Sequence, residues 1–260
     1  MKKFNKNFLL FIIFCISILL LIYLCNIVYT LFLNTLNIQN MFNQKKIFTI
    51  NKIVFFSSAF GESTTNTNNS STLKNIFQYT DIAIFINNNS SEFSAENTLK
   101  NVSIENINFI SFPKLGTPQF YYKNISDFAT PNVTDSNLIH DSLTFNITSD
   151  DYADLSTPTL YNNCANPIVL TYKNSDLINE HTISNFESIS YDGSLLKDCN
   201  IILNNLKCSI SFYIIIENNL GHKYRCPINI DIPLSNDTSS IFDGSYTYIY
   251  YPNYSFYLYT

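Results

Sequence analysis

Apolar residues follow two different patterns along the chain. From Phe8 to Leu33 they form a run without a charged residue, and beyond residue 46 they occur in short runs separated by polar residues. A helix needs about 20 apolar residues to cross the hydrocarbon core of a bilayer. A secretory signal has a shorter apolar region, of about 7–15 residues, and a small-residue cleavage site, which is missing after Leu33. The run 8–33 is therefore predicted to be a transmembrane signal anchor that is retained.

The positive charges around this run predict its orientation. Lys2, Lys3 and Lys6 lie directly before it, and the next positive charges, Lys45 and Lys46, come more than ten residues after it. Positive charge stays on the cytoplasmic side of a membrane. Residues 1–7 are therefore expected to be a tail in the cytoplasm or virion interior, residues 34–46 a stalk, and the C-terminus is expected outside.

The short apolar runs beyond the stalk predict β-strands. They are rich in β-branched and aromatic residues and are punctuated by Asn, Ser, Pro or Gly, which is typical of strands and turns. The predicted fold is an all-β ectodomain, a disulfide-bonded β-sandwich-like structure, behind a single N-terminal transmembrane helix. The runs that predict strands are 47–56, 81–86, 101–112, 143–148, 167–172 and 181–191.

The segment Lys207–Leu234 predicts a β-hairpin with one buried face. Alternate residues on both sides of the sequence Asn219-Leu220-Gly221 are apolar, as in a strand whose side chains alternate between two faces. A three-residue loop at that sequence brings the two apolar faces together and puts Gly221 where such hairpins need a left-handed residue. The resulting register opposes Ile216 to Tyr224, Ile214 to Cys226, and Cys208 to Ile232.

The cysteines predict two disulfides outside the membrane. Two of the six cysteines, Cys15 and Cys25, lie in the apolar run, and the other four are Cys164, Cys199, Cys208 and Cys226. An even number in an oxidising compartment is typical of disulfides. The hairpin register separates Cys208 from Cys226 by about 20 Å, whereas a bridge needs Cα atoms within about 7 Å. Each must then bond to Cys164 or Cys199, and the favoured set is Cys199–Cys208 with Cys164–Cys226. A zinc site is the alternative, but the paired spacing of zinc ligands is missing.

Composition and sequons divide the outer part into three regions. Residues 47–154 are polar and rich in N-glycosylation sequons, residues 155–245 contain the cysteines and predict a cysteine-stabilised β domain, and residues 246–260 form an aromatic tail. Chance alone gives several sequons in a chain this rich in Asn, Ser and Thr, so their number carries no information. The candidate acceptors are Asn68, Asn88, Asn101, Asn124, Asn132, Asn146 and Asn236.

Several function classes find no support in the sequence. The net charge is −5 and Arg225 is the only arginine, so clustered positive charge for nucleic-acid binding is missing. No glycine-rich phosphate loop and no H-E-x-x-H, C-x-x-C or G-x-S-x-G motif occurs. An acidic cluster lacks the spacing and glycine of a calcium loop; it comprises Asp150, Asp151 and Asp154. A luminal glycosyltransferase shares the predicted topology but needs an Asp-x-Asp motif, which is absent. We therefore expect a non-enzymatic protein without cofactor or metal.

The tyrosine-rich end of the chain has two interpretations. Tyr is favoured in strands, so this segment can be a last strand packed on the cysteine domain. Tyrosine also suits protein interfaces, because it combines a large apolar face with a hydrogen-bonding tip. In that case removing Asn253–Thr260 should leave folding intact and weaken assembly. The candidate interface residues are Tyr254, Phe256, Tyr257 and Tyr259.

Three stretches together resemble a known family. They are "CANPIVLTY" at Cys164–Tyr172, "LKCSISFYIIIENNLGHKYRCPINIDIPL" at Leu206–Leu234, and "DGSYTY" at Asp243–Tyr248. With the N-terminal anchor, this arrangement resembles per os infectivity factor 4, an envelope protein of baculoviruses and related nuclear arthropod DNA viruses. The resemblance covers Cys164–Tyr248 and the anchor, and residues 47–154 match nothing in it.

The resemblance implies a place in the virion envelope. The protein would be a subunit of a multi-protein oral virus-entry complex that infects gut cells, with other envelope proteins and a host cell-surface receptor as its partners. A membrane-anchored surface adhesin or structural envelope glycoprotein is the alternative, because an anchored β-ectodomain suits both.

The anchor prediction can be tested by mass spectrometry of the mature protein. We expect the N-terminal peptide to begin ahead of Phe8, because the run lacks a cleavage site. A mature chain that begins near Asn34 would contradict the prediction.

Overall fold

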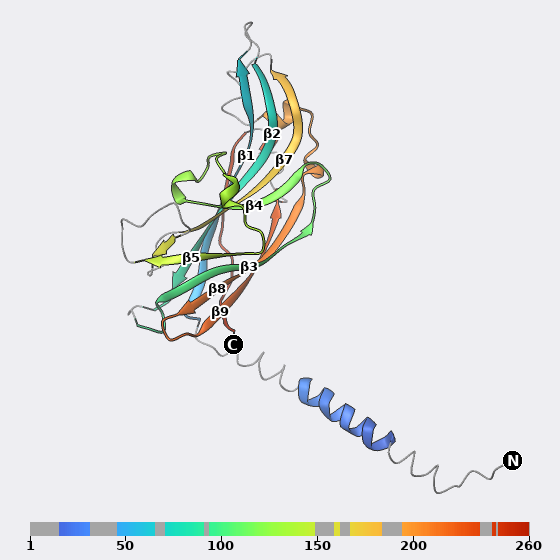
Figure 1. Cartoon of the computed structure of the whole chain (residues 1–260), viewed down its shortest axis with the longest axis vertical. Coiled ribbons are helices and arrows are strands. Elements are labelled where there is room, and N and C mark those ends of the chain that lie inside the picture. Colours follow the sequence, from blue (N-terminus) through green and yellow to red (C-terminus); the bar gives the residue numbers. More distant parts are fainter. Residues whose placement is uncertain are drawn as a thin grey trace, which may run out of the picture. The chain divides into compact units, whose positions relative to one another are not determined.

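The computed structural model describes two compact units, Met1–Lys45 and Lys46–Thr260. The described residues are 16–31, 46–65, 71–90, 94–148, 159–161, 167–183, 194–234, 241–242 and 244–259. In the first unit, residues 16–31 form a helix whose side chains are all exposed (Figure 1). Within the described ranges, no helix has both the length and the apolar character needed to span a membrane. The other residues of the expected anchor, 8–15 and 32–33, lie outside those ranges.

The second unit is a β-structure of two sheets, which confirms the predicted all-β character. The first sheet has five strands in the order β10-β1-β2-β7-β4. Its strands are β1 (Phe48–Thr65), β2 (Ser71–Asn88), β4 (Thr117–Lys123), β7 (Ile168–Ile183) and β10 (Tyr246–Tyr250). In Figure 1, β1, β2 and β7 run side by side as long, curved strands.

The second sheet has six strands in the order β11-β9-β8-β3-β5-β6. All its pairings are antiparallel except the parallel pair β5–β6. Its strands are β3 (Leu99–Ser111), β5 (Ser142–Thr148), β6 (Thr159–Tyr161), β8 (Cys208–Asn218), β9 (Lys223–Ile232) and β11 (Tyr257–Leu258).

The hairpin β8–β9 has the register expected from the sequence. Ile216 pairs with Tyr224, Ile214 with Cys226, and Cys208 with Ile232. The loop also has the expected length: Gly221 has φ of 83°, and its N–H donates to the carbonyl of Asn218 at 2.9 Å. The alternation of apolar residues was sufficient to predict this register, because a shift of the pairing by one residue would turn every apolar side chain of the strand to the other face.

The main hydrophobic core lies between the two sheets. Phe120 of the first sheet and Phe212 of the second have ring centroids 5.8 Å apart, and both side chains are almost fully buried. The same core contains apolar residues from β1, β2, β3, β7, β8 and β9. Two smaller clusters contain Leu195 and Leu196 of the short helix α3 (Leu195–Asp198) and Leu203 of the 3-10 turn η3 (Leu203–Asn205).

The outer face of the first sheet carries a buried ion pair. Lys123 Nζ lies 2.8 and 3.0 Å from the two carboxylate oxygens of Asp81, and both side chains are almost inaccessible to solvent. Thr171 Oγ1 and the N–H of Ala129 also donate to this carboxylate, and Lys123 donates to the carbonyl of Thr130. Burial raises the pKa of Asp81 and lowers the pKa of Lys123, while their mutual attraction opposes both shifts.

This ion pair fixes the segment after β4 onto the sheet. The segment contains the 3-10 turns η1 (Ile125–Asp127) and η2 (Asp135–Asn137), and Phe128 within it contacts Phe56 of β1. Removing one partner of a buried ion pair typically costs about 3–5 kcal/mol, because the other charge stays buried without compensation. The buried charges therefore hold a loop in place that has few buried apolar residues of its own.

The structure does not divide at residue 155, where the sequence suggested a boundary. Both sheets combine strands from 47–154 with strands from 155–260, and Lys46–Thr260 is one compact unit. The expected strand 181–191 is described only up to Ile183, as the end of β7. Strand β4 and the first half of β2 were not expected, because polar residues and a proline interrupt their apolar pattern.

Replacement of Phe212 by Ala should lower the free energy of unfolding by about 3–5 kcal/mol, because it leaves a cavity between the sheets. Phe112→Ala is the matched control, since Phe112 is 66% exposed and should change stability by only about 0.5 kcal/mol. Chemical denaturation of the full chain in detergent measures both. Equal stability of the two variants would contradict the assignment of Phe212 to the core.

Candidate functional site

The aromatic tail forms the last strands of both sheets. Strand β10 pairs antiparallel with β1, from Ile53 opposite Tyr250 to Ser57 opposite Tyr246. The chain then crosses to the second sheet, where Tyr257 and Leu258 of β11 pair with the start of β9. The structure therefore confirms the strand interpretation for 246–250 and 257–258.

Phe256 is a core residue, which corrects its assignment to an interface. Its side chain is 4% exposed, and its ring packs edge-on against Phe48 with centroids 6.3 Å apart. Its N–H donates to the carbonyl of Phe48 at 3.3 Å. Removal of Asn253–Thr260 would take this side chain out of the core, so the expectation that folding tolerates the truncation is also corrected.

The other three candidate interface residues are accessible to different degrees. Tyr259 is exposed and Tyr257 is partly exposed. Tyr254 is partly buried, and its hydroxyl donates to the carbonyl of Asn229 at 3.5 Å. Burial raises the pKa of Tyr254, so this hydroxyl stays protonated at neutral pH.

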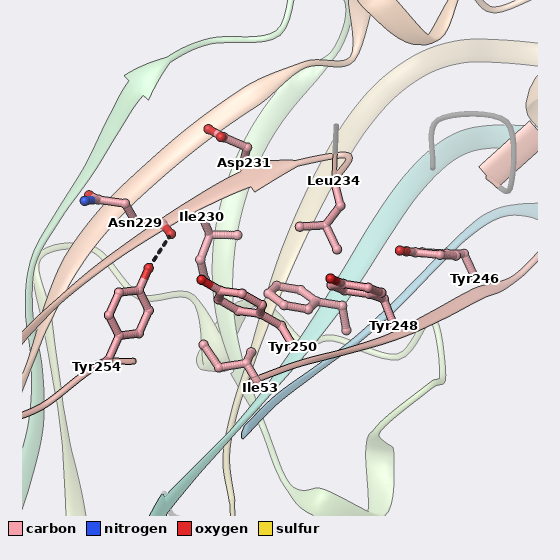
Figure 2. A pocket seen from close by; sticks show the side chains of 10 residues that line it. Ile53, Asn229, Ile230, Asp231, Leu234, Tyr246, Tyr248, Tyr250 and Tyr254 are labelled. Atoms are coloured by element: carbon pink, nitrogen blue, oxygen red, sulfur yellow. Dashed lines mark hydrogen bonds between the residues drawn. The ribbon is translucent and has the colours of Figure 1, made fainter. Parts of the chain in front are cut away.

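A groove of about 230 Å³ opens beside β10, between the edges of the two sheets. Figure 2 shows the rings of Tyr246, Tyr248 and Tyr250 in a row along β10, facing Ile230 and Leu234. The rings of Tyr246 and Tyr248 stack at 6.2 Å, and Tyr250 meets Tyr254 edge-on at 6.4 Å. The lining residues are Ile53, Phe55, Asn229, Ile230, Asp231, Leu234, Tyr246, Tyr248, Tyr250 and Tyr254.

One side chain in this lining carries a formal charge. Asp231 lies on β9 and is exposed, and its carboxylate accepts a hydrogen bond from Ser209 Oγ at 2.6 Å. The rest of the lining is aromatic, aliphatic or amide. The groove is therefore suited to bind apolar groups by contact, with tyrosine hydroxyls for polar contacts, whereas the Asp231 carboxylate points away from the tyrosine rings (Figure 2).

Arg225 holds the end of the tail against the second sheet. Its guanidinium carbon lies 4.6 Å from the ring centroid of Tyr213 and 4.5 Å from that of Tyr259. Cation–π contacts of this kind contribute about 0.5–1 kcal/mol each at exposed sites. The N–H of Tyr259 also donates to the carbonyl of Lys223 at 2.7 Å. The only arginine of the chain thus stabilises the crossing of the tail between the sheets.

The predicted disulfide Cys199–Cys208 is not present. Cys199, Cys208 and Cys226 are free thiols, so the predicted pairing Cys164–Cys226 is not seen either, and Cys164 itself lies outside the described residues. Cys208 belongs to the main core and donates to the carbonyl of Ser111 at 3.2 Å, whereas Cys199 packs on the two smaller clusters. The sequence pattern missed this separation: η3 does turn the chain at Leu203–Asn205, but Cys199 follows α3 and packs in a different cluster from Cys208.

Burial makes these thiols poor nucleophiles. It raises the pKa of Cys199 and of Cys208 to about 11 and that of Cys226 to about 12. The thiolate is the reactive form, so each is protonated at neutral pH. Among the described residues, no group of three or more His, Cys, Asp or Glu side chains is placed to hold a metal.

The candidate glycosylation sites differ in accessibility. Asn132 and Asn146 are exposed, while Asn101 and Asn124 are partly buried. The Asn88 amide donates to the carbonyl of Asn97 at 2.6 Å, so a glycan on its nitrogen would break that contact. The other two candidates, Asn68 and Asn236, lie outside the described residues.

No protein-family model matches the chain, and neither the curated proteins nor the solved structures contain a match. The resemblance to per os infectivity factor 4 therefore stays an expectation from the sequence.

Peptide mapping without reduction tests the state of the thiols. We expect Cys199 and Cys208 to be recovered as separate alkylated thiols once the protein is unfolded in alkylating reagent. In the native protein they should react slowly at pH 7–8, because burial favours the protonated form. A peptide that joins Cys199 to Cys208 would contradict the structure and support the pairing expected from the sequence.

Proposed function

We propose that this protein is a membrane-anchored viral envelope protein and a subunit of the oral infectivity complex that mediates infection of gut cells. The observation that carries the proposal is the tyrosine-lined groove at the open edge of the β-sandwich. A surface with several accessible tyrosines and few charges is typical of the central part of a protein interface. The partners are other envelope proteins of the same complex.

The N-terminal helix supports the membrane part of this proposal. Its residues 16–31 are largely apolar and all exposed, and large exposed apolar surfaces mark contacts with membranes or other proteins. The lysines that precede the run favour a cytoplasmic or virion-interior N-terminus and an outer β-sandwich. In this arrangement the groove faces the compartment where other envelope proteins present their outer domains.

The β-sandwich supports a binding role through its exposed aromatic side chains. Tyr248, Ile249 and Tyr250 are each about two-fifths exposed, and Tyr251 is 69% exposed. Large apolar side chains that gather on one edge usually mark an interaction site.

A native gel of mild-detergent extracts tests the proposal. We expect the wild-type chain to co-migrate with other envelope proteins from purified virions. The double variant Tyr248→Ser, Tyr250→Ser should migrate as the single chain, because it loses two apolar contact faces. Phe112→Ser, a similar change at an exposed position, is the control and should co-migrate normally.

Migration of the wild-type chain alone would contradict the proposed complex. Binding of that lone chain to gut cells would then favour the alternative of a surface adhesin.

A further inference from the structure

Strand β10 is an edge strand of the first sheet, and among the described strands its one neighbour is β1. It pairs with β1 on one side and stands at the end of the strand order. An edge strand presents backbone N–H and C=O groups that another strand can pair with. Residues Thr247–Tyr250 are all exposed, so the edge is accessible.

This edge lacks the features with which proteins usually prevent strand addition. Such edges commonly carry a lysine, a proline or an inward-pointing charge. Strand β10 reads Tyr-Thr-Tyr-Ile-Tyr, without charge, proline or glycine, and all five residues favour β-structure. Its outer edge is therefore well suited to accept an extended segment.

The second sheet is also open beside the same groove. Strand β11 covers β9 only at Tyr224 and Arg225, so the stretch of β9 that lines the groove, Asn229–Asp231, has β8 as its described strand neighbour. A segment added to β10 would lie over the groove and reach both sheets. Alternate side chains of a strand point to one face, so every second residue of that segment would enter the groove.

The side chains of the groove define the occupant further. Those that face it are apolar or tyrosine, whereas Asn229 and Asp231 are on the exposed face of β9, opposite the buried Ile230, and their side chains point away from the tyrosine rings (Figure 2). A matching segment therefore has alternating apolar side chains on the face that enters the groove.

We propose that β10 binds an extended segment of a partner protein as an added β-strand, with alternate apolar side chains in the tyrosine groove. This inference rests on the proposed function for the source of the segment, a neighbouring envelope protein. It goes further by specifying backbone pairing, which distinguishes the occupant from a helix or a loop.

A peptide of residues Lys52–Ser57, KIVFFS, is a suitable probe. It repeats the part of β1 with which β10 already pairs, and it has four apolar residues, of which Ile53 and Phe55 share one face of a strand. We expect saturable binding of the labelled peptide to the full chain in mild detergent, measured by fluorescence anisotropy. The same peptide with alternate backbone nitrogens methylated keeps its side chains but cannot pair as a strand. It should bind at least about tenfold more weakly, because two or more hydrogen bonds are lost.

Two variants of the chain test the groove itself. Tyr248→Lys puts a cation among the apolar lining residues of the groove and should lower the affinity for the peptide at least about tenfold. Leu220→Lys adds the same charge at an exposed position in the β8–β9 loop and should bind the peptide as the wild type does.

The outcomes separate the inference from the proposed function. Equal binding of the methylated peptide, or unchanged binding by Tyr248→Lys, would overturn strand addition even if the protein still co-migrates with envelope proteins. Peptide binding by a chain that never co-migrates would leave strand addition intact and overturn the proposed complex. Strand addition also predicts slower hydrogen exchange at Thr247–Tyr250 in the assembled complex. Protection of these amides in a dimer of this chain alone would overturn the assignment to a different partner.

Discussion

The packing of two apolar sheet faces against each other is the interaction on which the rest of this structure depends. Phe120 and Phe212 meet at its centre, and the paired faces of β8 and β9 contribute one side of it. Because the strands of each sheet come from distant parts of the chain, neither the sequon-rich region nor the cysteine region can bury its apolar face alone. The fold is therefore held mainly by contacts between segments that are far apart in the sequence.

A two-sheet structure of this kind has open edges, and the tail of this chain covers them only in part. It places β10 against β1 and then β11 against the start of β9. Phe256 fixes the crossing in the core, and Arg225 holds its end between two tyrosine rings. Between these two attachments, the tyrosine groove stays accessible. The chemistry of the site is that of contact and hydrogen bonding, since tyrosine and aliphatic side chains make up most of its lining.

Burial also explains which charged side chains in the unit Lys46–Thr260 need a partner. Asp81 and Lys123 are buried as a pair with further hydrogen bonds, and they fix a polar loop to the outer face of the first sheet. An isolated charge at that position would be strongly destabilising. The exposed Asp231 has no such constraint, because water solvates its carboxylate. Solvent access therefore decides whether an aspartate of this fold needs a buried partner.

The sequence by itself determined the features that depend on local alternation. It predicted the all-β character, most of the strands, and the register and loop of the β8–β9 hairpin, because side chains that alternate along a strand leave one consistent pairing of the apolar faces. It also showed the alternation of Tyr246, Tyr248 and Tyr250. Only the tertiary structure decided which strands share a sheet, that Phe256 belongs to the core, that Cys199 and Cys208 lie in different clusters, and that the groove forms between two sheet edges. These features depend on contacts between residues that are distant along the chain, and the spacing of residues within a segment contains no information about them.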